Sequence, residues 1–451
     1  MTTKTNLALL IFSASIVSLL SHPLHGEDWT RFRGANGAGI SKASAPVEWS
    51  PDKNLKWKTE LPGAGASSPI VLGDKVFLTC YSGYGLDRRN PGELKDLKRH
   101  LVCVDRASGK IAWERSVDGI MPEDTYTGMG VPEHGYASHT PVTDGKNIYV
   151  FFGKSGALAY DLEGKKLWQT SVGTESDVRR WGSASSPILH DNLLIVPAIA
   201  ESSAIIALDK TTGKEVWKQE AEGLNMSWST PIIVKIDDKR SDLVIGVPSE
   251  MWGMNPETGK MRWLCTDIPG NSFFTSVVAK DGIVYGSLGG RGGGGSFAVK
   301  AGGKGDVTET NLVWSTNDRN SYSTPVVFDN KLIFASRGIA TVLDTENGDK
   351  VSQVRMKAAE SKPSSSEEAP TRRRGGFGGD YSSPVVAGDK FYYTKRSGET
   401  FVFSATAEIK QIAVNRVTNE TEDFSSTPAV TDGQIFIRSS KHLYCVETSE
   451  E

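Results

Sequence analysis

Aromatic side chains recur near one position of a repeated phrase in this chain of 451 residues. The phrase is a Ser or Thr followed by Pro and an apolar residue, and Trp228, Tyr322 and Tyr381 each stand three residues before its proline. If the repeated units form a ring, residues at similar positions within each unit lie at a similar level along the axis of the ring. We therefore expect these aromatics to line one mouth of a central channel. The candidate ligand-binding residues are Tyr136, Trp181, Trp228, Phe274, Tyr322, Tyr381 and the charged Arg180.

Flat aromatic faces with a few charges at a concave mouth suit a small planar or sugar-like ligand. The alternative is that each ring packs on the neighbouring unit and plugs the channel. The seven histidines are scattered, and only His134 and His139 lie close, at a spacing of five that is weak support for a metal site. There is no Ser-His-Asp elbow and no zinc-binding helix motif. We therefore predict no catalytic residues and no metal ligands.

The four cysteines show no metal-type spacing and no adjacent pair. Cys103 and Cys445 occupy equivalent places in their repeats, where other copies have small or apolar residues, so burial as small apolar side chains is the favoured interpretation. A disulfide between Cys80 and Cys103 on neighbouring strands is the alternative in an oxidising compartment.

The repeated phrase sets the elements that must position the aromatic residues. Five of the seven gaps between successive copies are 44 to 48 residues, which predicts an array of small units closed into a ring. The copies, the fifth of them degenerate, are Ser67-Ser68-Pro69-Ile70, His139-Thr140-Pro141-Val142, Ser185-Ser186-Pro187-Ile188, Ser229-Thr230-Pro231-Ile232, Thr275-Ser276-Val277-Val278, Ser323-Thr324-Pro325-Val326, Ser382-Ser383-Pro384-Val385 and Ser426-Thr427-Pro428-Ala429.

The sequence of one unit predicts an antiparallel meander of four short strands. In the third copy we predict strands at 185–189, 193–196, 204–208 and 215–218, joined by tight turns. The last turn opens with Asp209 and contains Gly213, which supplies the positive φ that such a turn needs. The fourth strand then carries Trp217, a large side chain that fills the widening gap between blades at the rim. We expect such tryptophans to be structural.

The two ends of the chain share the eighth unit. The last copy has three predicted strands before the chain stops, and residues 54–58, with Trp57, precede the first copy without a repeat of their own. We infer that they supply the missing outer strand, which removes two exposed sheet edges. The predicted fold is all-β: an eight-bladed β-propeller of four-stranded antiparallel blades with N- and C-terminal strand closure.

Segments outside the repeats complete the predicted organisation. Residues 1–26 hold one charge, Lys4, and a 14-residue apolar stretch, which predicts a cleaved signal peptide, with a retained membrane anchor as the alternative. A leader segment spans 27–53 and the propeller 54–451, with flexible insertions at about 81–99 and 357–379. We expect a periplasmic or secreted monomer with no transmembrane segment in the mature chain. The formal net charge of −3 lacks the excess of Lys and Arg that is typical of nucleic-acid-binding proteins, so we predict no nucleic-acid partner.

The repeats resemble a known family. Thr212-Gly213-Lys214-Glu215-Val216-Trp217 and Thr258-Gly259-Lys260-Met261-Arg262-Trp263 are similar to the tryptophan-docked repeat of pyrroloquinoline-quinone (PQQ)-type eight-bladed propellers. Asp28-Trp29-Thr30-Arg31-Phe32-Arg33-Gly34 resembles the leader of secreted bacterial members. Some members are quinoprotein alcohol or sugar dehydrogenases. Others, such as the assembly lipoprotein of the Bam complex, are scaffolds without a cofactor, so fold alone does not assign the function.

The resemblance implies specific groups for a dehydrogenase. The quinone of such enzymes lies between a Trp and a disulfide of adjacent cysteines, with Ca²⁺ held by Glu and Asn oxygens and an Asp base nearby. This chain has no adjacent cysteines. We therefore expect an extracytoplasmic binding or scaffold propeller without its own catalysis or cofactor, which binds a protein partner or small ligand at one face. The alternative is a PQQ- and Ca²⁺-dependent alcohol or sugar dehydrogenase.

Overall fold

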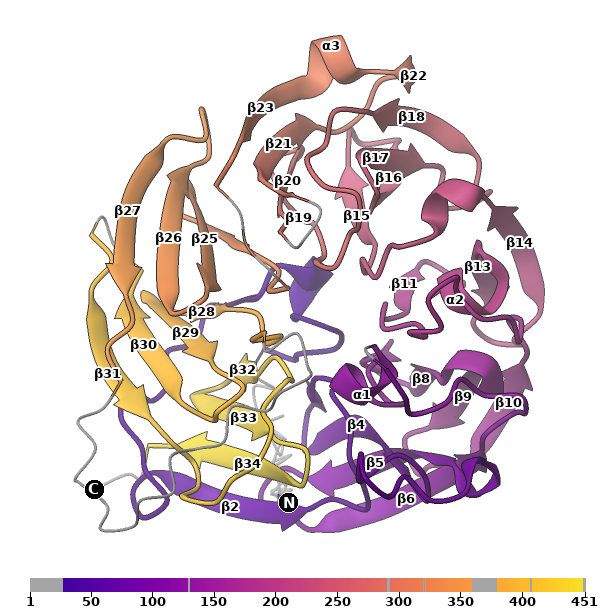
Figure 1. Ribbon diagram of the computed structural model, residues 1–451, viewed down its shortest axis with the longest axis vertical. Coiled ribbons are helices and arrows are strands. Elements are labelled where there is room, and N and C mark those ends of the chain that lie inside the picture. The colour runs from indigo at the N-terminus through magenta and orange to yellow at the C-terminus, as the bar shows by residue number, and fades with distance from the viewer. Residues whose placement is uncertain are drawn as a thin grey trace, which may run out of the picture.

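Eight antiparallel β-sheets surround a central axis in the computed structural model (Figure 1), which confirms the predicted all-β, eight-bladed propeller. The structure describes residues 27–128, 130–289, 293–318, 320, 322–358, 379–405 and 408–448. The predicted signal peptide, 1–26, lies outside the described residues, as does most of the second predicted insertion. None of the helices formed by the described residues is long and apolar enough to cross a membrane.

The innermost strand of every blade begins at the residue after the Pro of the repeated phrase, or after Val277 in the degenerate copy. Proline has no N–H to donate, so it sits just outside the strand ladder that it precedes. These strands are β3 (Ile70–Leu72), β7 (Val142–Thr143), β11 (Ile188–His190), β15 (Ile232–Lys235), β19 (Val278–Lys280), β24 (Val326–Phe328), β28 (Val385–Ala387) and β32 (Ala429–Thr431).

The next two strands of each blade are almost fully buried between neighbouring blades. The second strands are β4 (Lys75–Ser82), β8 (Asn147–Phe151), β12 (Leu193–Ala198), β16 (Ser241–Val247), β20 (Ile283–Ser287), β25 (Lys331–Ser336), β29 (Lys390–Thr394) and β33 (Gln434–Arg438). The third strands are β5 (Lys98–Asp105), β9 (Ala157–Asp161), β13 (Ala204–Asp209), β17 (Glu250–Met254), β21 (Ser296–Lys300), β26 (Ile339–Asp344), β30 (Thr400–Ser404) and β34 (His442–Glu447).

The outermost strands form the rim of the propeller. They are β6 (Ile111–Asp118), β10 (Lys166–Thr170), β14 (Glu215–Glu220), β18 (Met261–Cys265), β23 (Leu312–Thr316), β27 (Lys350–Arg355), β31 (Gln411–Asn415) and β2 (Leu55–Glu60). Two blades gain a fifth, parallel strand: β1 (Ile40–Ser41) pairs with β28, and β22 (Gly305–Asp306) pairs with β18. The short helices are η1 (Ala35–Gly37), η2 (Leu94–Asp96), α1 (Val131–His134), η3 (Gly153–Ser155), α2 (Ile199–Ser202), η4 (Glu222–Leu224) and α3 (Thr308–Asn311).

The ring closes through the eighth blade, as predicted. Strand β2, from the N-terminal part of the chain, pairs antiparallel with β34 from the C-terminal part, and Trp57 lies opposite Cys445. Figure 1 shows the indigo strand β2 beside the yellow strand β34. The closure leaves the buried strand β34 paired on both sides.

Hydrophobic clusters join neighbouring blades, and tryptophans clamp them at the rim. One cluster combines Phe77 and Cys103 of the first blade with Ile148 and Tyr160 of the second. At the rim, each clamping indole Nε1–H donates to a carbonyl in the last turn of the next blade, at 2.9–3.0 Å. The pairs are Trp57 with Arg106, Trp113 with Leu162, Trp168 with Lys210, Trp217 with Pro256 and Trp314 with Thr345.

Trp263 departs from this pattern. Its indole is fully buried and donates to Asp242 Oδ2 of its own blade at 2.7 Å. The next blade has no Asp-to-Gly turn to receive it, because the segment containing β22 and α3 joins that blade's third and fourth strands. Asp242 is instead held by the guanidinium groups of Arg240 and Arg262.

The first predicted insertion is shorter than expected, and the disulfide is absent. Strands β4 and β5 pair over eight positions, which narrows the loop to 83–97, and Tyr84 and Leu97 of this loop are buried. Cys80 lies opposite His100, and Cys103 lies opposite Phe77, so the two cysteines are not cross-strand neighbours. All four cysteines are buried free thiols.

Candidate functional site

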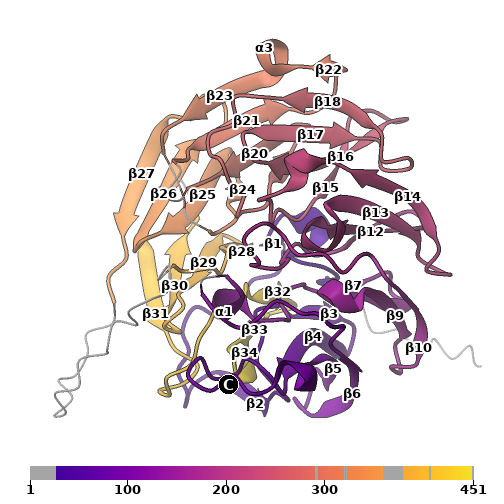
Figure 2. The same cartoon turned by 45° about the vertical axis from the view of Figure 1, so that its right-hand side comes forward.

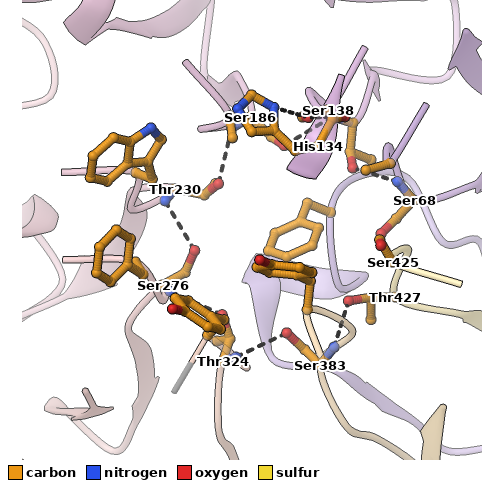
Figure 3. Close-up of a pocket in the computed structure, with 18 of the residues that line it drawn as sticks. Ser68, His134, Ser138, Ser186, Thr230, Ser276, Thr324, Ser383, Ser425 and Thr427 are labelled. Carbon is orange, nitrogen blue, oxygen red and sulfur yellow. Dashed lines mark hydrogen bonds between the residues drawn. The ribbon is translucent and has the colours of Figure 1, made fainter. Parts of the chain in front are cut away.

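A ring of hydroxyl side chains encircles the propeller axis. In seven of the eight blades the residue before the Pro, or before Val277, uses its backbone N–H to donate to the hydroxyl oxygen of the equivalent residue in the next blade. Seven such bonds of 2.9–3.0 Å are present, and Figure 3 shows several of them as dashed lines. We call these residues the hydroxyl ring: Ser68, Thr140, Ser186, Thr230, Ser276, Thr324, Ser383 and Thr427. The repeated phrase therefore links the blades at their inner ends.

A pocket of about 180 Å³ lies over the hydroxyl ring on the axis (Figure 3). All eight ring residues line it, together with five of the seven predicted site residues. We call these five the aromatic arc: Trp181, Trp228, Phe274, Tyr322 and Tyr381.

The aromatic arc is continuous from one blade to the next. Adjacent ring centroids are 5.6 Å apart for Trp181 and Trp228, 5.1 Å for Trp228 and Phe274, 5.4 Å for Phe274 and Tyr322, and 5.0 Å for Tyr322 and Tyr381. Each of the five side chains is only partly buried. The rings therefore pack on one another, as the plug alternative required, and still present surface to the pocket.

The other two predicted residues lie elsewhere. Tyr136 is buried among Tyr81, Tyr84 and Tyr126 under the loops of the first blades, and its hydroxyl donates to the carbonyl of Asp124 at 2.6 Å. It does not line the pocket and lies outside the arc. Arg180 is exposed and does not line the pocket. The guanidinium of its neighbour Arg179 lies 4.9 Å from the Trp181 ring centroid instead.

The ionisable groups at the pocket come from α1. Glu133 accepts hydrogen bonds from the Tyr381 hydroxyl at 3.2 Å and from Arg396 Nη1 at 2.6 Å. His134 Nε2 donates to the Trp181 carbonyl at 2.8 Å, and burial lowers the pKa of this histidine, so the imidazole is neutral at pH 7. Among the described residues no Lys or Arg lines the pocket.

The leader segment closes the pocket from below. Phe32 lines the pocket together with the hydroxyl ring. The Thr30 carbonyl accepts from the Thr143 N–H at 3.0 Å, and Asn36 Nδ2 donates to the Ile233 carbonyl at 2.8 Å, so the leader contacts the second and fourth blades. With β1 paired on β28, it crosses the centre of the ring, where the indigo ribbon lies in Figures 1 and 2. The pocket is therefore a blind cup and not a through-channel.

A smaller cavity of about 30 Å³ shares His134 and Trp181 with the cup. Ser183 Oγ donates to Glu201 Oε1 at 2.5 Å and lies 3.0 Å from His139 Nε2. Burial raises the pKa of Glu201 to about 7, and burial together with the nearby Arg99 lowers the pKa of His139 to about 3. Glu201 Oε2 and His139 Nδ1 have no partner within the described protein, which fits a buried water in this cavity.

Comparison with known proteins assigns the family. A family model described as outer membrane protein assembly factor BamB matches residues 94–245 and 199–451. The chain belongs to this PQQ-type propeller family. Among solved structures, BamB from Moraxella catarrhalis superposes on this PQQ-type propeller with a TM-score of 0.54 at 12% identity, over 87% of this chain and 99% of that one. A europium-containing methanol dehydrogenase superposes with a TM-score of 0.57 at 11% identity, over 91% and 89%. Such identities show the fold alone.

Curated relatives of this PQQ-type propeller include dehydrogenases. A polyvinylalcohol dehydrogenase of a Pseudomonas species is 22% identical over 297 residues, which is 54% of this chain and 41% of that protein. The quinoprotein alcohol dehydrogenase PedH of Pseudomonas putida is 28% identical over 176 residues, 37% of this chain and 28% of that protein. The chain thus spans less than half the length of these curated relatives.

The residues around the cup do not match the quinone site that the family resemblance implies. No cysteine lines it, and the cysteines are separate free thiols. The one carboxylate among its described lining residues is Glu133, which Arg396 and Tyr381 already engage, and no Asn or Gln is present to complete a Ca²⁺ site. The described lining therefore does not fit PQQ with Ca²⁺.

Several residues at the cup were not expected from the sequence. Phe32 belongs to the leader, and only the tertiary structure brings it to the axis. No sequence motif marks Glu133, and only the fold brings its carboxylate to the Tyr381 hydroxyl. The Ser or Thr of the repeated phrase was visible in every copy, and its recurrence at the inner end of each blade was the signal that could have identified the hydroxyl ring.

Proposed function

We propose that this chain is an extracytoplasmic binding propeller that holds a hydroxylated ring ligand, such as a sugar unit, in the aromatic cup, without catalysis of its own. The observation that carries the proposal is the aromatic arc: five partly exposed rings converge on one blind pocket on the axis. A concave, mostly apolar site with a few polar groups is the usual form of a small-ligand site.

The chemistry of the cup supports a ring with hydroxyl groups. The C–H face of a sugar ring can lie flat on Trp228 or Tyr322, while the hydroxyl ring below offers hydrogen-bond partners to the edge of the ligand. The relatives' names agree with the hydroxyl groups of such a ligand, though not with its ring, because polyvinyl alcohol and alcohols carry hydroxyl groups.

A double substitution tests the proposal. Trp228→Ala with Tyr322→Ala removes two neighbours of Phe274 and opens the arc. We expect the variant to keep a cooperative melting transition and to lose sugar binding by more than about tenfold, measured by calorimetric titration against a panel of neutral mono- and disaccharides. Tyr126→Ala, in the loop cluster outside the cup, is the matched control and should bind as the unchanged protein does. Unchanged binding by the double variant would contradict the proposal.

The dehydrogenase alternative has its own test. Purified protein is incubated with PQQ and Ca²⁺, and reduction of an artificial electron acceptor is followed with alcohols and sugars. We expect no Ca²⁺-dependent dye reduction, because the cup lacks the oxygen ligands and the adjacent cysteines. Turnover that requires both PQQ and Ca²⁺ would replace the binding proposal with the dehydrogenase.

The scaffold function is the second candidate, and the likeness to BamB favours it. A protein partner would contact the loops around the cup or the opposite face rather than enter a blind pocket. A partner whose binding survives Trp228→Ala with Tyr322→Ala would support the scaffold function, and one that competes with sugar would locate the interface at the cup.

A further inference from the structure

Three buried guanidinium groups lie around the floor of the cup. The exposed fractions of Arg31, Arg33 and Arg438 are 8%, 1% and 1%. Two of them come from the leader and one from β33, so they are distant in sequence and meet only in the folded ring. All three contact the segments that carry the hydroxyl ring.

Arg33 lies directly against the hydroxyl ring. Its Nη1 donates to the carbonyls of Thr324 at 3.2 Å and Pro384 at 2.8 Å, and its Nη2 donates to the carbonyl of Pro325 at 2.7 Å. Thr324 belongs to the hydroxyl ring, and Pro384 follows the ring member Ser383. Its remaining bonds go to leader carbonyls. Neutral carbonyl oxygens thus satisfy its donors without cancelling its charge.

Arg31 and Arg438 approach the floor from other blades. Arg31 Nη2 donates to the Pro231 carbonyl at 3.1 Å, next to the ring member Thr230. Arg438 Nη1 donates to the carbonyl and hydroxyl oxygens of Ser67 at 2.9 and 2.7 Å, next to the ring member Ser68. The Nε atoms of both arginines are buried without a partner in the described protein.

No carboxylate of the described residues forms an ion pair with any of these three arginines. Burial lowers the pKa of Arg31 to about 10 and that of Arg33 to about 9, so both keep their charge at neutral pH. Buried charges in proteins are ordinarily paired, because an unpaired one loses its hydration without compensation. Three uncompensated positive charges therefore surround the floor of the cup.

The hydroxyl ring adds hydrogen-bond donors at the same place. Seven of its hydroxyl oxygens accept a backbone N–H. Within the described hydrogen bonds none of the ring hydroxyls donates its own proton, so these protons remain for a ligand in the cup. Hydroxyl donors over buried cations form a site for negative charge.

We propose that the floor of the cup receives an anionic substituent, a carboxylate, sulfate or phosphate ester, carried by the ring ligand whose face lies on the aromatic arc. The inference rests on the proposed binding function and narrows its ligand class to acidic sugars. The substituent would accept hydrogen bonds from the hydroxyl ring and supply the negative charge that the three arginines lack.

Matched ligands test the inference on the full chain. Glucose is compared with glucuronate, glucose 6-sulfate and glucose 6-phosphate by calorimetric titration, with inorganic sulfate and phosphate as separate arms. We expect at least one anionic sugar to bind about tenfold or more tightly than glucose. The preference should persist at 0.5 M NaCl, because buried charges are screened far less than exposed ones. The three anionic sugars distinguish the substituents, and tight binding of an inorganic anion alone would place recognition in the anion rather than in the sugar and would overturn the inference.

Two variants separate the buried cations from charges at the rim. Arg31→Gln removes one buried charge and a single hydrogen bond, and we expect it to reduce the anionic preference several-fold while glucose binding stays unchanged. Arg180→Gln, at an exposed position, is the matched control and should keep the full preference. If Arg31→Gln proves unstable, Thr230→Val tests the floor instead, because it removes one hydroxyl proton of the ring at nearly unchanged volume and should reduce the preference. Thr230→Ser, which keeps the hydroxyl, is its control and should retain the preference.

The outcomes for the two proposals are distinct. Equal binding of glucose and its anionic derivatives would overturn the inference and leave the binding function intact. Failure of every sugar, neutral or anionic, would overturn the binding function and the inference with it. Loss of the anionic preference in Arg180→Gln rather than in Arg31→Gln would assign the preference to the rim.

Discussion

At the scale of single residues, burial sets the charge of the groups beside the cup. Glu201 is 3% exposed and His139 is 4% exposed, and they share Ser183 as a hydrogen-bond neighbour. Desolvation raises the pKa of Glu201 and lowers that of His139, so the imidazole is neutral at pH 7 and the carboxyl becomes neutral below pH 7 in the folded protein. A neutral pair can be buried here at lower free-energy cost than two ions.

Stability should fall as Glu201 ionises. The pKa of Glu201 is about 7 in the folded chain against an ordinary 4.5, so the folded state holds a proton that the unfolded state has lost between these values. Stability is therefore lost as pH rises from about 4.5 to 7 and stays lower above pH 7, by up to roughly 3 kcal/mol. Glu201→Gln removes this penalty and keeps the oxygen that accepts from Ser183. We expect it to be stabilised relative to the unchanged protein at pH 8 and not at pH 4.5, as measured by urea unfolding.

The exposed Glu222 provides the control. Glu222→Gln should change the free energy of unfolding little and equally at both pH values. An equal effect of Glu201→Gln at pH 4.5 and pH 8 would mean that folding does not raise the pKa of this carboxyl.

At the scale of elements, the blade-to-blade contact at the rim depends on a glycine under each clamping tryptophan. Gly259 has a φ of +70°, and a Cβ there would lie 2.5 Å from Cε3 of Trp217 in the preceding blade. The glycine therefore serves both the turn and the close approach of the indole. Gly109, Gly164, Gly213 and Gly348 meet their tryptophans in the same way.

Two glycine substitutions separate these roles. Gly282 has a similar φ of +77°, with nothing within 4 Å of a Cβ added there. Gly282→Ala should cost only the strain of the left-handed backbone, about 1 kcal/mol. Gly259→Ala should cost that strain and the displacement of Trp217, about 3 kcal/mol together. Equal losses in thermal unfolding would show that the indole contact contributes nothing beyond the turn.

At the scale of the whole molecule, residues near the N-terminus perform two tasks. Strand β2 closes the ring by pairing with β34, and the leader before it crosses the channel and forms the floor of the cup. Both tasks join parts of the chain that are far apart in sequence, so neither contributes until the blades between them have formed.

Successive truncations should separate closure from the floor. A chain that begins at residue 54 keeps β2 and Trp57 but lacks the leader, so we expect a cooperative transition with sugar binding lost. A chain that begins at residue 62 also lacks β2, which exposes the edge of β34 and removes the indole that contacts Gly109. We expect its melting temperature to lie about 10 °C below that of the chain that begins at residue 54. Equal melting temperatures of the two truncated chains would contradict the role of β2 in closure.

The local chemistry of the sequence determined the architecture. A Ser/Thr-Pro phrase at a period of about 46 residues predicted the inner strand of each blade, because proline, which has no N–H to donate, is favoured at the start of a strand or at a sheet edge. The Asp-to-Gly turns and their tryptophans predicted the rim, and Trp57 predicted the closure. Four aromatics of the candidate site, Trp228, Phe274, Tyr322 and Tyr381, followed from their shared phase. Trp181, Tyr136 and Arg180 lie in loops whose course no repeat specifies, and of these only Trp181 lines the cup.

Only the tertiary structure decided what fills the axis. Arg31, Phe32 and Arg33 form a short run in a leader without periodicity, and their meeting with Arg438 depends on the ring being closed. Burial, which removes water from these guanidinium groups, arises from contacts among five or more blades and cannot be read from any one segment. The repeats therefore specified where a site could be, and the long-range packing of the leader decided its charge.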